Sequence, residues 1–166
     1  MKKLFLSLSF VGAAFGSFAQ SSNGPGKFSI GAEATIPTGD AHQFFNYGIG
    51  GSLKYEYPLS KTVFITVSAG YESLHAKSGL QEPDTKSSFG FLPVKAGIKP
   101  YLDGGFFFEG QLGTVFSTEK GGGNSFLYSP GLGYTFNGGL EIGVRYEAWS
   151  NGGTIGQVGA RLAYRF

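Results

Sequence analysis

Five charged residues stand at alternate positions of segments in which apolar and polar residues alternate; they are Glu33, Lys95, Glu109, Arg145 and Arg161. Acids and bases that leave water need partners, so such residues on an enclosed face are expected to form ion pairs. A strand rises about 3.3 Å per residue, which is roughly 2.5 Å along the axis of a closed sheet tilted near 40°. On that count the five residues fall at about one level, and Arg161 comes next to Glu33 if the last strand pairs with the first. We therefore predict one internal network of ion pairs and hydrogen bonds.

The same acids admit a catalytic interpretation. Two carboxylates such as Glu109 and Glu141 are the groups that glycoside hydrolysis uses. That chemistry depends on a defined separation between the carboxylates, and nothing in the sequence supplies it. Balanced internal charges are the favoured interpretation.

The only two histidines, His42 and His75, lie in segments predicted as loops. With a serine or an aspartate they could form a hydrolase or acyltransferase site, but no serine stands at a spacing typical of such enzymes. A metal site made of Asp40, His42 and His75 would need three ligands that converge from two loops. We predict solvated loop histidines, no catalytic residue, no metal and no cofactor.

Eight segments with a period of two must position these side chains. Apolar residues such as Phe108, Val144 and Leu162 fall on one face, and the charged residues fall on the other. Pro93 and Pro130 interrupt two of the segments, and because each lacks an N–H, a bulge or a register shift is expected there. The predicted strands are residues 27–38, 47–57, 62–73, 88–99, 105–117, 125–136, 139–149 and 154–166.

The connections between these segments alternate in length. Those at 39–46, 74–87 and 118–124 are longer and more polar than the others, one of which contains the hairpin signal Asn137-Gly138. Bacterial membrane barrels have short periplasmic turns and longer extracellular loops. No stretch has helical periodicity. Aromatic residues near the strand ends are predicted to form interfacial girdles, namely Tyr57, Tyr101, Phe136 and Phe166 at one end and Tyr71, Phe89, Phe116, Tyr146 and Trp149 at the other.

Residues 1–19 have the layout of a secretory signal peptide, with Lys2 and Lys3 before an apolar core and Ser17-Phe18-Ala19 as cleavage site. Residues 20–26 are predicted to be a flexible lead-in, and residues 27–166 the barrel domain. Without Lys2 and Lys3 the 13 basic residues become 11, equal to the 11 acidic ones. This balance gives no argument for a nucleic-acid partner. A chain with 29 glycines, 16% aromatic residues and no cysteine suits a membrane barrel better than a soluble core.

The last thirteen residues complete the pattern, because Leu162, Tyr164 and Phe166 alternate with Ala163 and Arg165. The leader, the alternating segments and the ending Ala-Arg-Leu-Ala-Tyr-Arg-Phe together resemble the small eight-stranded outer-membrane β-barrels, the group of the OmpA transmembrane domain and OmpX. The resemblance implies an all-β fold, an eight-stranded antiparallel up-and-down transmembrane β-barrel, as a monomer in the outer membrane of a Gram-negative bacterium. It also implies that Leu162, Tyr164 and Phe166 form the signal that the barrel assembly machinery recognises.

That group includes adhesins, lipid-modifying enzymes and structural barrels, so the architecture does not choose a function. We expect a structural or surface-interaction role through the longer loops, with a lumen plugged by charged side chains and with outer-membrane lipid as the surroundings. The surface ligand or host partner stays open. The alternatives are a lipid-modifying enzyme that uses a loop histidine, a small porin-like channel, and a secreted lipocalin-like barrel with an apolar interior.

Overall fold

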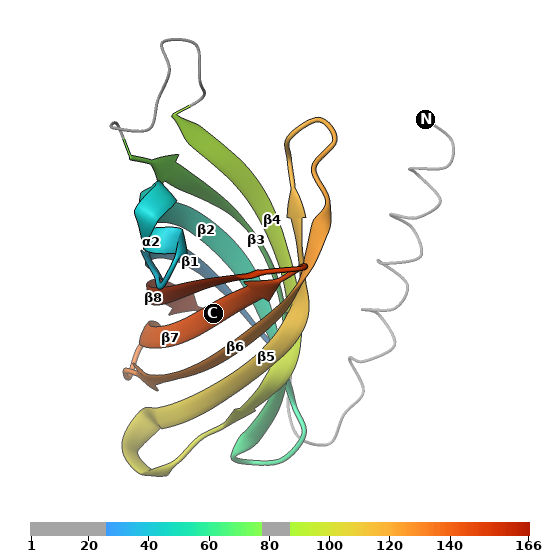
Figure 1. Ribbon diagram of the computed structural model, residues 1–166. Coiled ribbons are helices and arrows are strands. Elements are labelled where there is room, and N and C mark those ends of the chain that lie inside the picture. Colours follow the sequence, from blue (N-terminus) through green and yellow to red (C-terminus); the bar gives the residue numbers. More distant parts are fainter. Residues whose placement is uncertain (1–25, 78–86) are drawn as a thin grey trace, which may run out of the picture.

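The chain folds into a closed barrel of eight antiparallel strands (Figure 1). A computed structural model describes residues 26–77 and 87–166. Each strand pairs with its neighbours in sequence, and the last strand pairs with the first, which confirms the predicted fold class. The predicted signal peptide lies outside the described residues, as does the lead-in apart from Gly26. The strands are β1 (Lys27–Thr38), β2 (Phe45–Pro58), β3 (Val63–Ala76), β4 (Ser88–Pro100), β5 (Phe106–Ser117), β6 (Asn124–Thr135), β7 (Leu140–Ser150) and β8 (Thr154–Arg165).

The sheet is apolar outside and polar inside. Phe108, Val144 and Leu162 are 52%, 49% and 53% exposed on the outer wall. The neighbouring charged residues, among them Arg145 and Arg161, turn into the lumen and keep a tenth or less of their side chains exposed. Water-soluble barrels have the opposite arrangement, so the lipocalin-like alternative is wrong.

The two ends of the barrel differ. We call the end with connections 39–44, 77–87, 118–123 and 151–153 the loop end. The other end, the turn end, carries the three remaining connections together with both ends of the barrel sequence. There Phe28 and Phe166 exchange backbone hydrogen bonds of 3.2 and 2.9 Å, which complete the closure. At the predicted hairpin, Gly138 has a φ of 98°, a conformation that glycine adopts without strain.

Three features at the rims differ from the prediction. A short helix, α2 (Ala41–Phe44), and a 3₁₀ turn, η2 (Asp103–Gly105), are present; both are too short to give a periodic sequence signal (Figure 1). Strand β3 extends to Ala76, so Leu74 and His75 belong to a strand and not to a loop. Leu74 is fully buried, and this burial explains the longer strand. Within the described residues, no helix is long and apolar enough to cross a membrane.

The expected bulges at Pro93 and Pro130 are absent, and that prediction is wrong. The register is the same before and after Pro93, and it is likewise unchanged across Pro130. Instead, the ladder between β6 and β7 lacks the pairs that Ser129 and Pro130 would make, with no extra residue inserted. A slip by one residue would turn every later side chain to the wrong face, and this penalty keeps the register fixed.

Three of the predicted girdle aromatics do not lie on the outer wall. Trp149 is 2% exposed and lies in the lumen, Phe89 packs edge-on against Phe45, and the Tyr101 hydroxyl is hydrogen-bonded inside the turn end. Trp149 stands two residues after the lumen-facing Glu147, so strand parity would have placed it correctly. Other predicted girdle residues face outward; they include Tyr71, Phe116, Phe136, Tyr146 and Phe166. Ala148 has the parity of the outward-facing set but is fully buried, because so small a side chain lies below the surface that its larger neighbours form.

Candidate functional site

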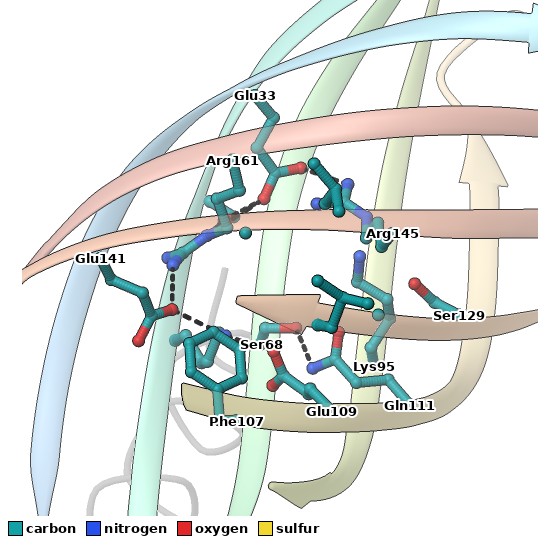
Figure 2. A pocket seen from close by; sticks show the side chains of 16 residues that line it. Glu33, Ser68, Lys95, Phe107, Glu109, Gln111, Ser129, Glu141, Arg145 and Arg161 are labelled. Atoms are coloured by element: carbon teal, nitrogen blue, oxygen red, sulfur yellow. Dashed lines mark hydrogen bonds and ion pairs between the residues drawn. The ribbon is translucent and has the colours of Figure 1, made fainter. Parts of the chain in front are cut away.

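Glu33 lies at the centre of the lumen charge network. It pairs in register with Arg161 across the β1–β8 seam, where Arg161 Nε is 3.3 Å from Glu33 Oε1. Arg145 donates to the other carboxylate oxygen at 2.6 Å, and Ser52 donates to Oε1 at 2.6 Å. Figure 2 shows the Glu33 carboxylate between the two arginine side chains. The contact between Glu33 and Arg161 therefore forms where the barrel closes.

Lys95 and Glu109, the other two residues of the predicted set, are joined to this centre only through other charged residues. Lys95 Nζ lies 2.8 Å from Glu147, which also accepts a 3.0 Å hydrogen bond from Arg145. Glu109 accepts a 2.6 Å hydrogen bond from Lys54. All five predicted residues nevertheless line one central cavity (Figure 2).

The predicted network omitted more than half of the charged residues that the lumen holds. Alternation along each strand identifies these residues as inward-facing from the sequence. They were left out because the estimate placed the whole network at one height along the barrel axis. The omitted residues that make ion pairs are Lys54, Glu56, Lys99, Glu141, Glu147 and Arg165. The network therefore extends along the lumen axis and is not confined to one level.

Lys99 closes the turn end. It is fully buried, and its ammonium group pairs with both Glu56 and Glu141 and lies 4.0 Å from the centre of the Phe107 ring. Such a position over an aromatic face adds a cation–π attraction. The side chains of Lys99 and Glu56 are both inaccessible to solvent.

Arg165 and Tyr101 complete the same end. Arg165 donates to the Tyr101 hydroxyl at 2.6 Å and to Glu56 at 3.3 Å. Burial raises the pKa of the Tyr101 phenol. The phenol therefore keeps its proton at neutral pH, and it can donate that proton to Thr135 at 3.0 Å.

An apolar cluster fills the loop end. It consists of four buried residues, which we call the loop-end cluster: Leu74, Val115, Leu127 and Trp149. Phe45, Phe91 and Ile155 pack against it. The Trp149 indole N–H donates to Glu147 at 2.8 Å, so the cluster stands directly on the charge network. The lumen is thus closed by apolar packing at one end and by buried ion pairs at the other.

Glu72 is the exception among the lumen acids, because it makes no ion pair within the described residues. Its carboxylate accepts hydrogen bonds from Thr35 and, at 3.2 Å, from Gln157. Gln157 also donates to Glu147 at 3.4 Å. Glu72 is thereby joined to the network through neutral donors.

The central cavity is small, with a volume of about 30 Å³. This is room for one or two water molecules. Glu109 Oε1 and Ser129 Oγ, which both belong to residues lining the cavity, are buried without a protein hydrogen-bond partner. Buried, paired charged side chains fill most of this interior.

The histidines do not assemble a catalytic site in the described part of the chain. His75, predicted as a solvated loop residue, lies in β3 with its ring stacked on Tyr47 at 4.6 Å and its Nδ1 buried without a partner. His42 lies in α2. Across residues 26–77 and 87–166, no group of three or more His, Cys, Asp or Glu side chains is placed to hold a metal ion.

The three residues of the predicted assembly signal lie on the outer wall. Leu162, Tyr164 and Phe166 are all more than half exposed, and the rings of Tyr164 and Phe166 are 6.5 Å apart. They present a continuous apolar ridge along the last strand. This surface is available to lipid or to another protein.

No protein-family model and no curated protein sequence matches the chain. Several solved structures match the chain. Ail, the attachment invasion locus protein of Yersinia pestis, matches in complex with a heparin analogue with a TM-score of 0.61 at 19% identity, over 87% of this chain and 99% of that chain. The N-terminal β-barrel domain of Pseudomonas aeruginosa OprF matches with a TM-score of 0.58 at 14% identity, over 84% and 97%. Neisserial surface protein A matches with a TM-score of 0.50 at 12% identity, over 85% and 97%. The chain therefore has the fold of the small eight-stranded outer-membrane β-barrels, as its sequence resemblance implied.

Proposed function

We propose that the protein is an outer-membrane β-barrel that conducts no solute and serves as a rigid scaffold for loops 39–44, 77–87 and 118–123 at the cell surface. One observation carries this proposal: the lumen is filled by paired charges and closed at both ends. A barrel of eight strands is just wide enough for side chains to fill its interior.

The membrane location rests on the outer wall. Its half-exposed Phe, Leu, Ile and Val side chains, such as Ile30, Leu53 and Leu112, would be costly in water and stable against acyl chains. Residues 1–19 would direct export, and Leu162, Tyr164 and Phe166 would present the chain to the assembly machinery.

Conduction is disfavoured at each end for a different physical reason. At the turn end an ion would have to displace Lys99 from two carboxylates. At the loop end it would have to pass the dry loop-end cluster, and apolar constrictions exclude ions by losing their water. The small-channel alternative therefore has no support from the geometry.

The two remaining alternatives also lack support. A lipid-modifying enzyme would need an activated nucleophile, and in the described residues neither His42 nor His75 is hydrogen-bonded to a hydroxyl or a carboxylate. Polyanion binding, suggested by the heparin analogue bound to Ail, would need basic loops. The three longer loops carry four acids, Asp40, Glu82, Asp84 and Glu119, against three lysines, Lys77, Lys86 and Lys120.

Membrane fractionation followed by electrophoresis with and without heating tests the location and the closed barrel together. We expect the protein in the outer-membrane fraction, with a mobility that changes on heating. Planar-bilayer recording should show no discrete conductance. Discrete, reproducible openings of the purified wild-type protein would overturn the closed-lumen proposal.

The orientation can be tested with single cysteines, because the chain has none of its own. Lys120→Cys places a thiol in a loop-end connection, and Asp103→Cys places one at the turn end. In intact cells, a membrane-impermeant maleimide should label the Lys120→Cys protein and leave the Asp103→Cys protein unlabelled. Labelling of Asp103→Cys alone would show that the turn end faces the outside of the cell, and it would contradict the proposed role of the loops at the cell surface.

A further inference from the structure

An apolar groove of about 360 Å³ lies on the outer wall across β5 to β8. Its lining side chains include Phe108 on β5, Pro130 and Leu132 on β6, Val144 and Tyr146 on β7, and Val158 on β8. Binding pockets for small ligands begin at roughly this volume, about 300 Å³, and are lined mainly by apolar side chains. The groove is open along one side and its lining is apolar, so it suits a thin apolar ligand that lies along the outer wall.

Two small residues in register make the wall concave there. Gly110 of β5 stands opposite Pro130 of β6, and both belong to the outward-facing set. A side chain added at Gly110 would meet no atom within 4 Å, so the space beside Pro130 is open to the outside. The larger residues Phe108 and Leu132 stand next to this pair along their strands and form part of the rim.

The groove has no charged group to offer a ligand. Arg145 borders it, but its guanidinium is turned into the lumen, where it pairs with Glu33 and Glu147. The groove therefore suits hydrocarbon and offers nothing to a phosphate or a sugar.

The groove also lies over the part of the β6–β7 ladder in which two pairs are missing. In the ladder between β6 and β7, Ser129 and Pro130 make no pairs with Glu147 and Tyr146. Backbone groups without partners are costly in hydrocarbon, and Pro130 limits this cost because it has no N–H to leave unpaired. Gly131 and Arg145 border both the groove and the central cavity, so a single layer of residues separates the two.

We propose that this groove binds one acyl chain of a membrane lipid and holds it against the β6–β7 seam. The inference rests on the proposed membrane location, because only there does the groove face hydrocarbon. Its continuity with the apolar outer wall, which acyl chains cover in a membrane, favours an acyl chain over a second copy of the barrel. A bound chain would keep water away from the interrupted ladder.

Native mass spectrometry of the barrel, extracted from membranes in mild detergent, tests this proposal. We expect one phospholipid to stay with the wild-type barrel. Gly110→Trp should fill the groove and lower the ratio of lipid-bound to lipid-free barrel by about tenfold, the change that a loss of roughly one decade in affinity produces. Ala69→Trp is the matched control, because it places the same side chain on the outer wall of β3, away from the groove, and should leave the lipid bound.

Val158→Trp provides a second way to fill the groove if Gly110→Trp does not fold. Equal lipid retention by both groove variants and by Ala69→Trp would overturn the proposal. So would a barrel that reaches the membrane and shifts on heating but retains no lipid, or one that leaves the membrane as a dimer whose contact the Gly110→Trp variant abolishes. Failure to reach the membrane at all would instead overturn the proposed function.

Discussion

Glu33 on β1 and Arg161 on β8 face each other across the seam that closes the barrel, with Arg161 Nε 3.3 Å from Glu33 Oε1. The first and last strands thus carry opposite charges at the same register position. A slip by one residue would turn Arg161 toward the outer wall, where a guanidinium in hydrocarbon costs about 2–4 kcal/mol at the midplane. This pair therefore helps to select the register in which the barrel closes.

Replacing the central acid should destabilise the barrel. In Glu33→Ala, Arg145 and Arg161 keep their contacts with Glu147 and Glu141 but lose their shared partner. We expect a loss of about 3 kcal/mol in the free energy of unfolding, measured by urea titration in lipid vesicles. Asp40→Asn, at an exposed loop position, is the control and should change stability by less than about 0.5 kcal/mol. Equal stability of both variants would contradict a structural role for the network.

Lys99 should matter more than Arg165, although both close the turn end. Lys99→Met leaves Glu56 and Glu141 without the cation between them and should cost about 4 kcal/mol. Arg165→Met should cost about 2 kcal/mol, because the Arg165 side chain is partly exposed and Glu56 keeps Lys99. Adding Glu141→Gln to Lys99→Met should restore part of the loss, because it removes the excess negative charge while Glu56 keeps Arg165 and Arg161 keeps Glu33. A double variant less stable than Lys99→Met would contradict this account.

Trp149, the only tryptophan in the chain, reports directly on the loop-end cluster. Because it faces the lumen, its fluorescence should be emitted at short wavelength and should resist quenching by lipids with brominated acyl chains. The control is Tyr71→Trp combined with Trp149→Phe, which places the indole on the outer wall, where Tyr71 is exposed. That variant should be quenched strongly. Strong quenching of Trp149 in the wild-type protein would contradict its position in the lumen and would place it in an interfacial girdle.

The last aromatic residue should matter for assembly beyond its part in stability. The Phe166 side chain is 68% exposed, while its backbone pairs with Phe28. We expect Phe166→Ala to cost about as much unfolding free energy as Phe136→Ala, a matched outer-wall change at the same end, roughly 1–2 kcal/mol. The amount of protein in the outer membrane of cells should nevertheless fall clearly, as quantitative immunoblotting of fractions would show. A variant with normal membrane levels would argue against the assembly signal at Leu162, Tyr164 and Phe166.

Two glycines on neighbouring strands should respond oppositely to the same substitution. A Cβ at Gly97 would collide with the carbonyl oxygen of Gly110 and lie 2.8 Å from Gln111 Cα, whereas a Cβ at Gly110 meets nothing. Gly97→Ala should therefore cost about 2 kcal/mol in unfolding free energy, as overpacking does. Gly110→Ala should be neutral or slightly stabilising, by up to about 1 kcal/mol. Similar losses of unfolding free energy in both variants would show that the close approach of β4 and β5 does not require a glycine at position 97.

The strands could be predicted from the sequence because a membrane barrel repeats one simple rule. Alternation fixes which side chains face outward, and turn residues fix where strands end, so the predicted 27–38 and the observed β1 agree. The rule weakens at the rims. Leu74 and Trp149 lie near predicted strand ends, where their residue types fit a loop or an interface as well as a lumen.

The charge network was predicted to lie at one height along the barrel axis, but it extends along that axis. The rise per residue places charges along one strand, but the partners of a side chain depend on the stagger between strands and on how far each chain reaches. Lys95 therefore pairs with Glu147, and Glu109 pairs with Lys54, although the level estimate grouped Lys95 and Glu109 with Glu33.

By itself the sequence determined the inside-out sheet and which charged side chains face the lumen, because both follow from parity along single strands. Only the tertiary structure decided that Lys99 lies between Glu56 and Glu141, that the loop-end cluster is dry, and that a groove opens beside Gly110. These features depend on side chains from several strands that meet in space, and no spacing within one strand records such a meeting.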